Sequence, residues 1–325
     1  MAVKTIAQAL NEAFHQEMQK NPKIIVLGED VGKDGGVFRI TDGLYEKFGP
    51  ERVVDTPLSE LAIAGVSVGL AIGGMKPVCE FQFDGFSIPS LDQVIDHATR
   101  YRNRTRGKMT CPAVFRFPYG GGIRALEHHS ESPETHYIHT PGLKVVVPST
   151  PYDAKGLLTS ALRESEDPVV FMEPKKIYRA FKQEVPDEPY AIPLSQASKV
   201  REGDDLTLVC WGAMRAVCEQ AIDSLEGKYS VDLIDLRTLW PMDIDTYINS
   251  IKKTGRVLIV HEAPRTLGFG AELIALANEK AFLSLKAPPI RVTGYDIPTP
   301  LPKLEKHYYP DLDRIVDGIE RLMKF

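Results

Sequence analysis

Acidic side chains follow two of the predicted strands. Glu29 and Asp30 follow the short apolar run 24–27, and Glu60 follows a second strand-like piece. Glu60 also opens a segment, 61–72, made almost wholly of small and apolar residues. We expect that segment to be a buried helix, because it has little face for solvent. A carboxylate on its first turn then lies at the edge of a dry region, which is costly unless a bound group compensates the charge.

An amide, aromatic rings and imidazoles follow the next two predicted strands. Gln82 and Phe86 come at the end of one strand, and His128 and His129 close a glycine-rich run after the other. Parallel α/β sheets bind ligands beyond the carboxyl ends of their strands, so these loops should meet at one edge. Each group also has a structural explanation. Glu60 can complement the positive end of its helix, and Phe86 can belong to the core.

The elements that must position these groups alternate between strand and helix along 325 residues. This alternation predicts an α/β fold with two domains, each a mostly parallel sheet flanked by helices. A proline-rich stretch at 181–203 suggests an interdomain linker or an extended ribbon, and we divide the chain at 1–195 and 196–325. Strands are expected at 24–27, 78–83, 113–117, 143–147, 168–172, 206–211, 231–236, 257–261 and 290–293, and helices at 6–18, 61–72, 90–105, 154–163, 213–225, 244–252, 270–280 and 311–324.

Composition narrows the class of protein. The net charge is -5, with no basic face for nucleic acid. The four cysteines form no Cys-x-x-Cys pair and are expected to be reduced and buried, as in cytosolic proteins. No apolar run has membrane-spanning length and no signal peptide is evident. We therefore expect a prokaryotic cytoplasmic protein, or a mitochondrial matrix protein whose presequence has been removed.

Nucleotide signatures are weak. No Gly-x-x-x-x-Gly-Lys-Ser/Thr pattern is present. Gly268-Phe269-Gly270 gives part of a dinucleotide pattern without its third glycine, which is more typical of a tight turn between strand and helix. The Gly-Asp-Gly…Asn pattern that holds a diphosphate-bound magnesium is also missing.

Ordered matches along nearly the whole chain give a specific resemblance. The chain resembles the β subunit of the thiamine-diphosphate-dependent 2-oxo acid dehydrogenase component of pyruvate and branched-chain 2-oxo acid dehydrogenase complexes. The matching segments are Asp55-Thr56-Pro57-Leu58-Ser59-Glu60 and the ranges 27–31, 36–38, 129–130, 141–146, 148–158, 235–238 and 253–256. Finer matches at 129–134, 184–196, 261–264 and 294–300 look like the branched-chain type.

The resemblance implies a fold and roles for single residues. It implies a transketolase-like pyrimidine-binding domain followed by a transketolase-type C-terminal domain. Glu60 matches the glutamate that hydrogen-bonds the cofactor's aminopyrimidine and so promotes loss of a proton from the thiazolium carbon. His129 matches a histidine that orients and protonates intermediates or the incoming lipoyl group. The matching cofactor-binding positions are Glu29, Leu58, Glu60, Gln82 and Phe86.

The resemblance also implies partners. An α subunit would hold magnesium and the diphosphate, which accounts for the missing Gly-Asp-Gly…Asn pattern, in an assembly of two α and two β chains. The second domain would pair β with β. Asp296 and the terminal carboxylate of Phe325 match positions that dock the lipoyl acyltransferase core. A potassium ion is a further expectation, near 162–167.

With its α subunit, the implied enzyme is an oxidoreductase of branched-chain amino acid degradation. It would oxidatively decarboxylate branched-chain 2-oxo acids, of the 3-methyl-2-oxobutanoate dehydrogenase type, and reductively acylate the lipoyl group. Pyruvate is the alternative substrate. Two other classes stay open: a nicotinamide-dependent oxidoreductase that uses the Gly268 turn, and a non-catalytic scaffold subunit.

Overall fold

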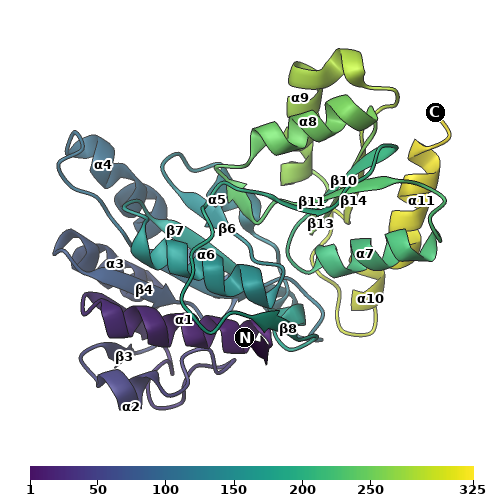
Figure 1. Cartoon of the computed structure of the whole chain (residues 1–325). Coiled ribbons are helices and arrows are strands. Elements are labelled where there is room, and N and C mark those ends of the chain that lie inside the picture. The colour runs from purple at the N-terminus through teal and green to yellow at the C-terminus, as the bar shows by residue number, and fades with distance from the viewer.

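Two sheets lie side by side in the computed structural model, which describes residues 1–325 (Figure 1). Neighbouring strands are parallel except at one edge of each sheet. In spatial order, the first sheet has β12 (Thr238–Trp240), β6 (Lys144–Val146), β7 (Val169–Pro174), β5 (Val114–Tyr119), β4 (Lys76–Glu80), β2 (Ile24–Gly28) and β3 (Val53–Asp55). The second sheet has β14 (Ile290–Gly294), β13 (Val257–Pro264), β10 (Leu206–Cys210), β11 (Val231–Asp235) and β9 (Ser198–Arg201). The α/β class and mostly parallel sheets predicted from the sequence are therefore confirmed.

Helices cover both faces of each sheet (Figure 1). On one side, α1 (Ile6–Lys20) and α6 (Pro151–Arg163) pack on the first sheet, and α7 (Met214–Ser224) and α11 (Leu312–Leu322) on the second. On the other side lie α3 (Glu60–Ile72), α5 (Glu134–Ile138), α8 (Ile244–Thr254) and α9 (Phe269–Ala281). The remaining short helices are α2 (Leu44–Phe48), α4 (Tyr101–Arg104), α10 (Glu305–Tyr308), the π turn at 93–97, and the 3-10 segments at 84–90, 98–100, 127–129, 175–177 and 282–284.

Local sequence signals explain where these elements begin. The α1 helix starts at a capping box, because the Thr5 hydroxyl accepts from the Gln8 amide and the Gln8 side chain accepts from the Thr5 amide. All nine strands predicted from apolar runs are present, displaced by at most three residues at either end. Continuous apolar runs form strands here because both faces of the sheets are covered.

The proline-rich stretch, which the sequence predicts to be a linker or an extended ribbon, contains two short strands. Within it, β8 (Gln183–Val185) pairs with the N-terminal strand β1 (Ala2–Lys4), and β9 joins the second sheet. The chain later returns to the first sheet, where β12 pairs with β6. An ion pair of 2.6 Å between Arg237 and Asp153 reinforces this crossing. The two sheets are thus tied together by backbone pairing as well as by side chains.

The helix predicted at 90–105 is not continuous. The chain there passes from a 3-10 turn through one π turn, Gln93–His97, to the short helix α4. The hydroxyls of Thr99 and Thr105 bond carbonyl oxygens four residues earlier. Such bonds bend helices, and Pro89 removes a further donor. The sequence pattern therefore predicted the location of this helical segment correctly, but it did not predict the 3-10 and π turns that interrupt it.

The α3 helix is only half buried, which corrects the expectation of a fully buried helix. Ile63, Ala64 and Val68 face the core, whereas Leu61 and Val66 are 46% and 55% exposed. The unpartnered face is apolar and continues to Leu58, which is 78% exposed. None of the helices combines the length and apolar composition needed to cross a membrane.

Candidate active site

The predicted site residues gather where β2, β3, β4 and β5 end. Gly28, the last residue of β2, pairs with Asp55 of β3 and Glu80 of β4, so the three following loops begin at one level. Asp55 accepts hydrogen bonds from the amides of Gly32 and Lys33, which fixes the loop after β2. The sheet thus brings together segments that are far apart in sequence, as expected for a parallel sheet.

Carboxyl groups form the first half of the site. Glu29 is 8% exposed, and its Oε1 atom has no hydrogen-bond partner. Burial, the charge of Glu60 and the charge of Asp30 raise the pKa of Glu29. Gln82 donates a 2.9 Å hydrogen bond to Asp30 and so joins the same group. Glu29, Glu60 and Gln82 are therefore neighbours, as the sequence predicts, and the buried Oε1 atom of Glu29 can still accept a hydrogen bond.

Aromatic rings and imidazoles form the second half. The His129 ring lies 4.3 Å from the Phe83 ring and 5.1 Å from the Phe86 ring, centroid to centroid, with edge-to-face geometry. The His128 ring lies 4.3 Å from that of His129. Burial lowers the pKa of His129, with smaller contributions from His128 and Lys175. The His129 Nδ1 atom is buried without a partner. The lowered pKa favours a neutral imidazole, which can accept and return a proton.

The two halves join at consecutive residues, since Gln82 belongs to the carboxyl group and Phe83 contacts His129. An aromatic wall, a carboxyl on the first turn of α3 and an unpaired buried carboxyl oxygen suit a planar heterocycle with ring nitrogens. These residues fit the pyrimidine of thiamine diphosphate. Leu58 lies beside Glu60 in sequence but is exposed, so the wall on that side is incomplete in this chain alone.

Sequence reasoning missed two buried residues behind His129. Asp84 and Lys175 form an ion pair of 2.8 Å with both side chains fully buried. A signal was present, because Lys175 directly follows β7 and Asp84 follows the loop after β4, at the same edge of the sheet. Their pairing could not be read from the sequence, since they are 91 residues apart.

Protein cations contact the loop at 162–167. No group of three or more His, Cys, Asp or Glu residues in the chain could hold a metal ion. Near 162–167, the Lys76 ammonium donates to the carbonyl oxygens of Leu162 and Arg163 at 3.0 and 2.9 Å. Arg102 pairs with the carboxylates of Glu166 and Asp167. Protein cations already bond these oxygens, and a potassium ion at this loop stays a prediction of the resemblance.

The Gly268 turn serves packing. A side chain at Gly268 or Gly270 would collide with the His261 ring, so both glycines let α9 approach β13 closely. His261 is fully buried against Trp211, with ring centroids 5.2 Å apart. The glycines therefore have a structural explanation that requires no dinucleotide.

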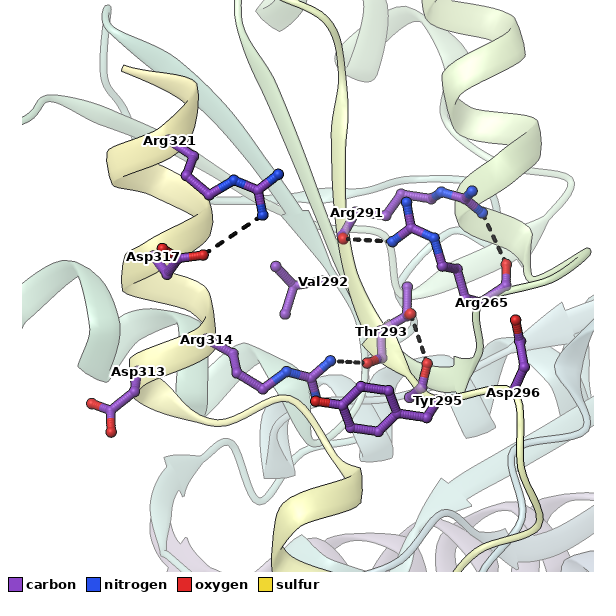
Figure 2. Close-up of a pocket in the computed structure, with 11 residues that line it drawn as sticks. Arg265, Arg291, Val292, Thr293, Tyr295, Asp296, Asp313, Arg314, Asp317 and Arg321 are labelled. Atoms are coloured by element: carbon purple, nitrogen blue, oxygen red, sulfur yellow. Dashed lines mark hydrogen bonds and ion pairs between the residues drawn. The ribbon is translucent and has the colours of Figure 1, made fainter. Parts of the chain in front are cut away.

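The docking candidates lie on the second domain. Asp296 is exposed and accepts two 2.7 Å hydrogen bonds from Thr266, and Phe325 is exposed at the chain end. Asp296 borders a cavity of about 490 Å³ between β14 and α11. Figure 2 shows Arg321 and Asp317 of α11 on one side of this cavity and Arg265 and Arg291 on the other. This charged hollow is separate from the His129 group, which does not line it.

Comparisons with known proteins agree with this geometry. Residues 3–180 match the family model "Transketolase, pyrimidine binding domain", and residues 195–315 match "Transketolase, C-terminal domain". A solved structure titled "Split gene transketolase, inactive beta4 tetramer" aligns with a TM-score of 0.80 at 21% identity, covering 99% of both chains. At this identity the likeness shows the fold alone.

Relatives are similar over almost the full length. The chain is 52% identical to the "Pyruvate dehydrogenase E1 component subunit beta" of Acholeplasma laidlawii, covering 100% of this chain and 99% of that one. It is 48% identical to the mitochondrial "2-oxoisovalerate dehydrogenase subunit beta" of Dictyostelium discoideum, covering 98% and 86%. It is 46% identical to the "3-methyl-2-oxobutanoate dehydrogenase subunit beta" of Mycobacterium tuberculosis (strain CDC 1551 / Oshkosh), covering 98% and 92%. On this fold, site and similarity, the chain belongs to the E1 β subunits of the 2-oxo acid dehydrogenases.

Proposed function

We propose that this chain supplies the pyrimidine half of a thiamine-diphosphate site and that an α subunit completes it. The observation that carries the proposal is the juxtaposition of Glu29 and Glu60 with the exposed apolar face of α3. Solvent-exposed apolar surface of this kind marks an interaction site. A partner that covers Leu61 and Val66 would also enclose Glu60, which begins the same helix.

The residues of this chain would divide the work. Thiamine diphosphate, when bound, supplies the electron sink that decarboxylation of a 2-oxo acid requires. The Glu60 carboxyl would hold a proton against a pyrimidine ring nitrogen, and Glu29 would form the adjoining carboxyl of that wall. Phe86 would close the wall beside the ring. His129 would move a proton to or from the reacting acid or lipoyl group, because its lowered pKa favours a neutral ring that can accept a proton.

The partners follow from what the chain lacks. None of its groups of His, Cys, Asp or Glu residues could hold a metal ion, so we assign magnesium and the diphosphate to the α subunit. We propose an assembly of two α and two β chains. We further propose that Asp296 and the Phe325 carboxylate dock the lipoyl acyltransferase core, since both are exposed.

The acid itself has two candidates. We propose branched-chain 2-oxo acids, on the sequence segments at 184–196 and 294–300 and the similarity to the 2-oxoisovalerate and 3-methyl-2-oxobutanoate enzymes. Pyruvate is the second candidate, favoured by the name of the relative at 52% identity. Both require the same cofactor chemistry and differ only in the size of the group on the carbonyl carbon.

The test is co-expression with the candidate α subunit, followed by decarboxylation assays with pyruvate and with the 2-oxo acids of valine, leucine and isoleucine. Glu60→Gln should lower the rate at least about 100-fold, because it removes a proton-shuttling group. The matched control is Glu51→Gln, an exposed glutamate that precedes β3. Unchanged activity in both Glu60→Gln and His129→Ala would favour a non-catalytic scaffold. Tight binding of a nicotinamide nucleotide to the chain alone would favour the other oxidoreductase class.

A further inference from the structure

The Asp84–Lys175 ion pair lies in the interior behind the His129 group. Asp84 begins the turn at 84–90 and Lys175 follows β7. The Lys175 ammonium donates to Asp84 Oδ1 at 2.8 Å. Burial raises the pKa of Asp84 to about 6, although Lys175 and the Glu131 amide oppose that effect. Burying such a pair rarely adds much stability, so its presence calls for another explanation.

Asp84 also fixes the backbone next to His129. Its second oxygen, Oδ2, accepts a 2.6 Å hydrogen bond from the Glu131 amide, two residues after His129. The adjacent Gly85 touches this loop so closely that a side chain there would collide with the His128 carbonyl oxygen. The Asp84-Gly85 segment therefore holds the residues on both sides of the His129 ring.

The charge of Lys175 lies close enough to the His129 ring to affect its protonation. Its ammonium lies 5.9 Å from the centroid of the Phe83 ring, and that ring lies 4.3 Å from the His129 ring. The ammonium is therefore no more than about 10 Å from the imidazole. At that distance, in a partly desolvated site, a positive charge disfavours a second one by about 1–2 kcal/mol.

Other charged groups face His129 from its own turn. His128 disfavours the protonated ring, as Lys175 does, whereas Glu127 favours it. Glu127 and His128 are both about half exposed, so solvent screens their charges. The negative charge of Asp84, in the turn at 84–90, partly offsets the effect of the Lys175 charge on the His129 ring. Lys175 is the only one of these positive groups that is fully buried.

We infer that Asp84 and Lys175 are positioning residues for His129: Asp84 fixes the loop that carries the imidazole, and the Lys175 ammonium adds to the effect of burial in disfavouring a protonated imidazole. The catalytic part of this inference rests on the proposed function of His129. The geometric and electrostatic part concerns this chain alone and can be measured without any activity.

The experiment follows the His129 ring by NMR in the full chain with labelled histidine, assigning its signal by comparison with His129→Asn. Three variants are titrated: Lys175→Met, Asp84→Asn/Lys175→Met, and the control Lys176→Met. The double variant keeps an acceptor for the Glu131 amide and leaves no unpaired buried charge, so it guards against misfolding. Lys176 is exposed, and its replacement removes the same charge one residue away.

We expect the pKa of His129 to rise by about 0.5–1 unit in both variants that lack Lys175. In the single variant Asp84 takes up a proton once it has no partner, so both variants lose the Asp84 charge together with the Lys175 charge. The expected rise in the His129 pKa is therefore smaller than removal of an unpaired ammonium would give. The control should change the pKa by less than about 0.2 unit, because solvent screens an exposed charge. A His129 pKa that stays at the wild-type value in both variants overturns the inference.

A second measurement separates this inference from the proposed function. The assembled enzyme is assayed across pH with the double variant. The limb of the activity profile that reports His129 should move to higher pH by the NMR shift. If the NMR pKa rises and the activity profile does not move, the inference stands and the proposed role of His129 is refuted.

Discussion

The hydroxyl of Tyr309 donates a 2.7 Å hydrogen bond to the carbonyl oxygen of Ser130, the residue after His129. Tyr309 follows α10 in the second domain, whereas Ser130 belongs to the first. Thr299 donates to the same carbonyl at 3.2 Å. Gly121 leaves room for the Tyr309 ring, because a side chain there would collide with it. The loop that carries His129 is thus held by both domains.

Replacing Tyr309 with Phe should therefore lower activity more than stability. The variant loses one hydrogen bond, which costs about 1 kcal/mol of unfolding free energy. The rate in the assembled enzyme should fall roughly tenfold, because small displacements of a reacting group are costly. The matched control is Tyr308→Phe, an adjacent buried tyrosine that does not bond this loop. Equal rates for the two variants, measured by steady-state assay, would contradict the prediction.

Glu134 should make stability depend on pH. Burial raises the pKa of Glu134 to about 8 from its ordinary value of 4.5, and neither carboxylate oxygen has a partner. The folded state therefore binds this proton more tightly than the unfolded state does. Below about pH 4.5 the group is protonated in both states and does not affect the free energy of unfolding. Between pH 4.5 and pH 8, Glu134 lowers the free energy of unfolding by about 1.4 kcal/mol for each pH unit.

Glu134→Gln should remove that slope. The variant is expected to be more stable than the wild type at pH 8 and nearly equal to it at pH 4.5, by denaturant unfolding at each pH. Glu131→Gln, at a more accessible site three residues earlier, serves as the control and should leave the slope in place. A parallel pH dependence in wild type and Glu134→Gln would show that another group is responsible.

The exposed face of α3 should be required for assembly and not for folding. Val66→Lys places a charge where we propose the α subunit to pack, and an unpaired charge in an interface costs several kcal/mol. Co-purification of the α subunit should fall at least roughly tenfold, while the melting temperature of the isolated chain stays within a few degrees. Val3→Lys, at an equally exposed site on β1, should leave co-purification intact.

The chain should show no specific requirement for potassium. Exchanging potassium for tetramethylammonium chloride at equal ionic strength should leave its melting temperature unchanged. Lys76→Met should lower the unfolding free energy by about 1–2 kcal/mol, because two carbonyl oxygens at the end of α6 lose a cationic donor. Lys23→Met, a nearby exposed lysine, is the control. Saturable stabilisation of the wild type by potassium alone would contradict this view of the loop.

The sequence by itself determined where the strands lie along the chain and which loops carry Glu29, Glu60, Gln82 and His129. Apolar periodicity and capping signals extend over only a few residues, so they can be recognised without knowing which segments pack against each other. A parallel sheet then places the ends of successive strands at one edge, which is why these residues could be predicted to meet.

Only the tertiary structure decided how that site is supported. The Asp84–Lys175 pair, the Tyr309–Ser130 bond and the return of β12 to the first sheet all join residues far apart in the chain. The sequence also predicted a buried α3, whereas one apolar face of that helix is open. The composition of a segment shows that its side chains are apolar. Only the fold shows whether the same chain buries those side chains or leaves them exposed for a partner chain to cover.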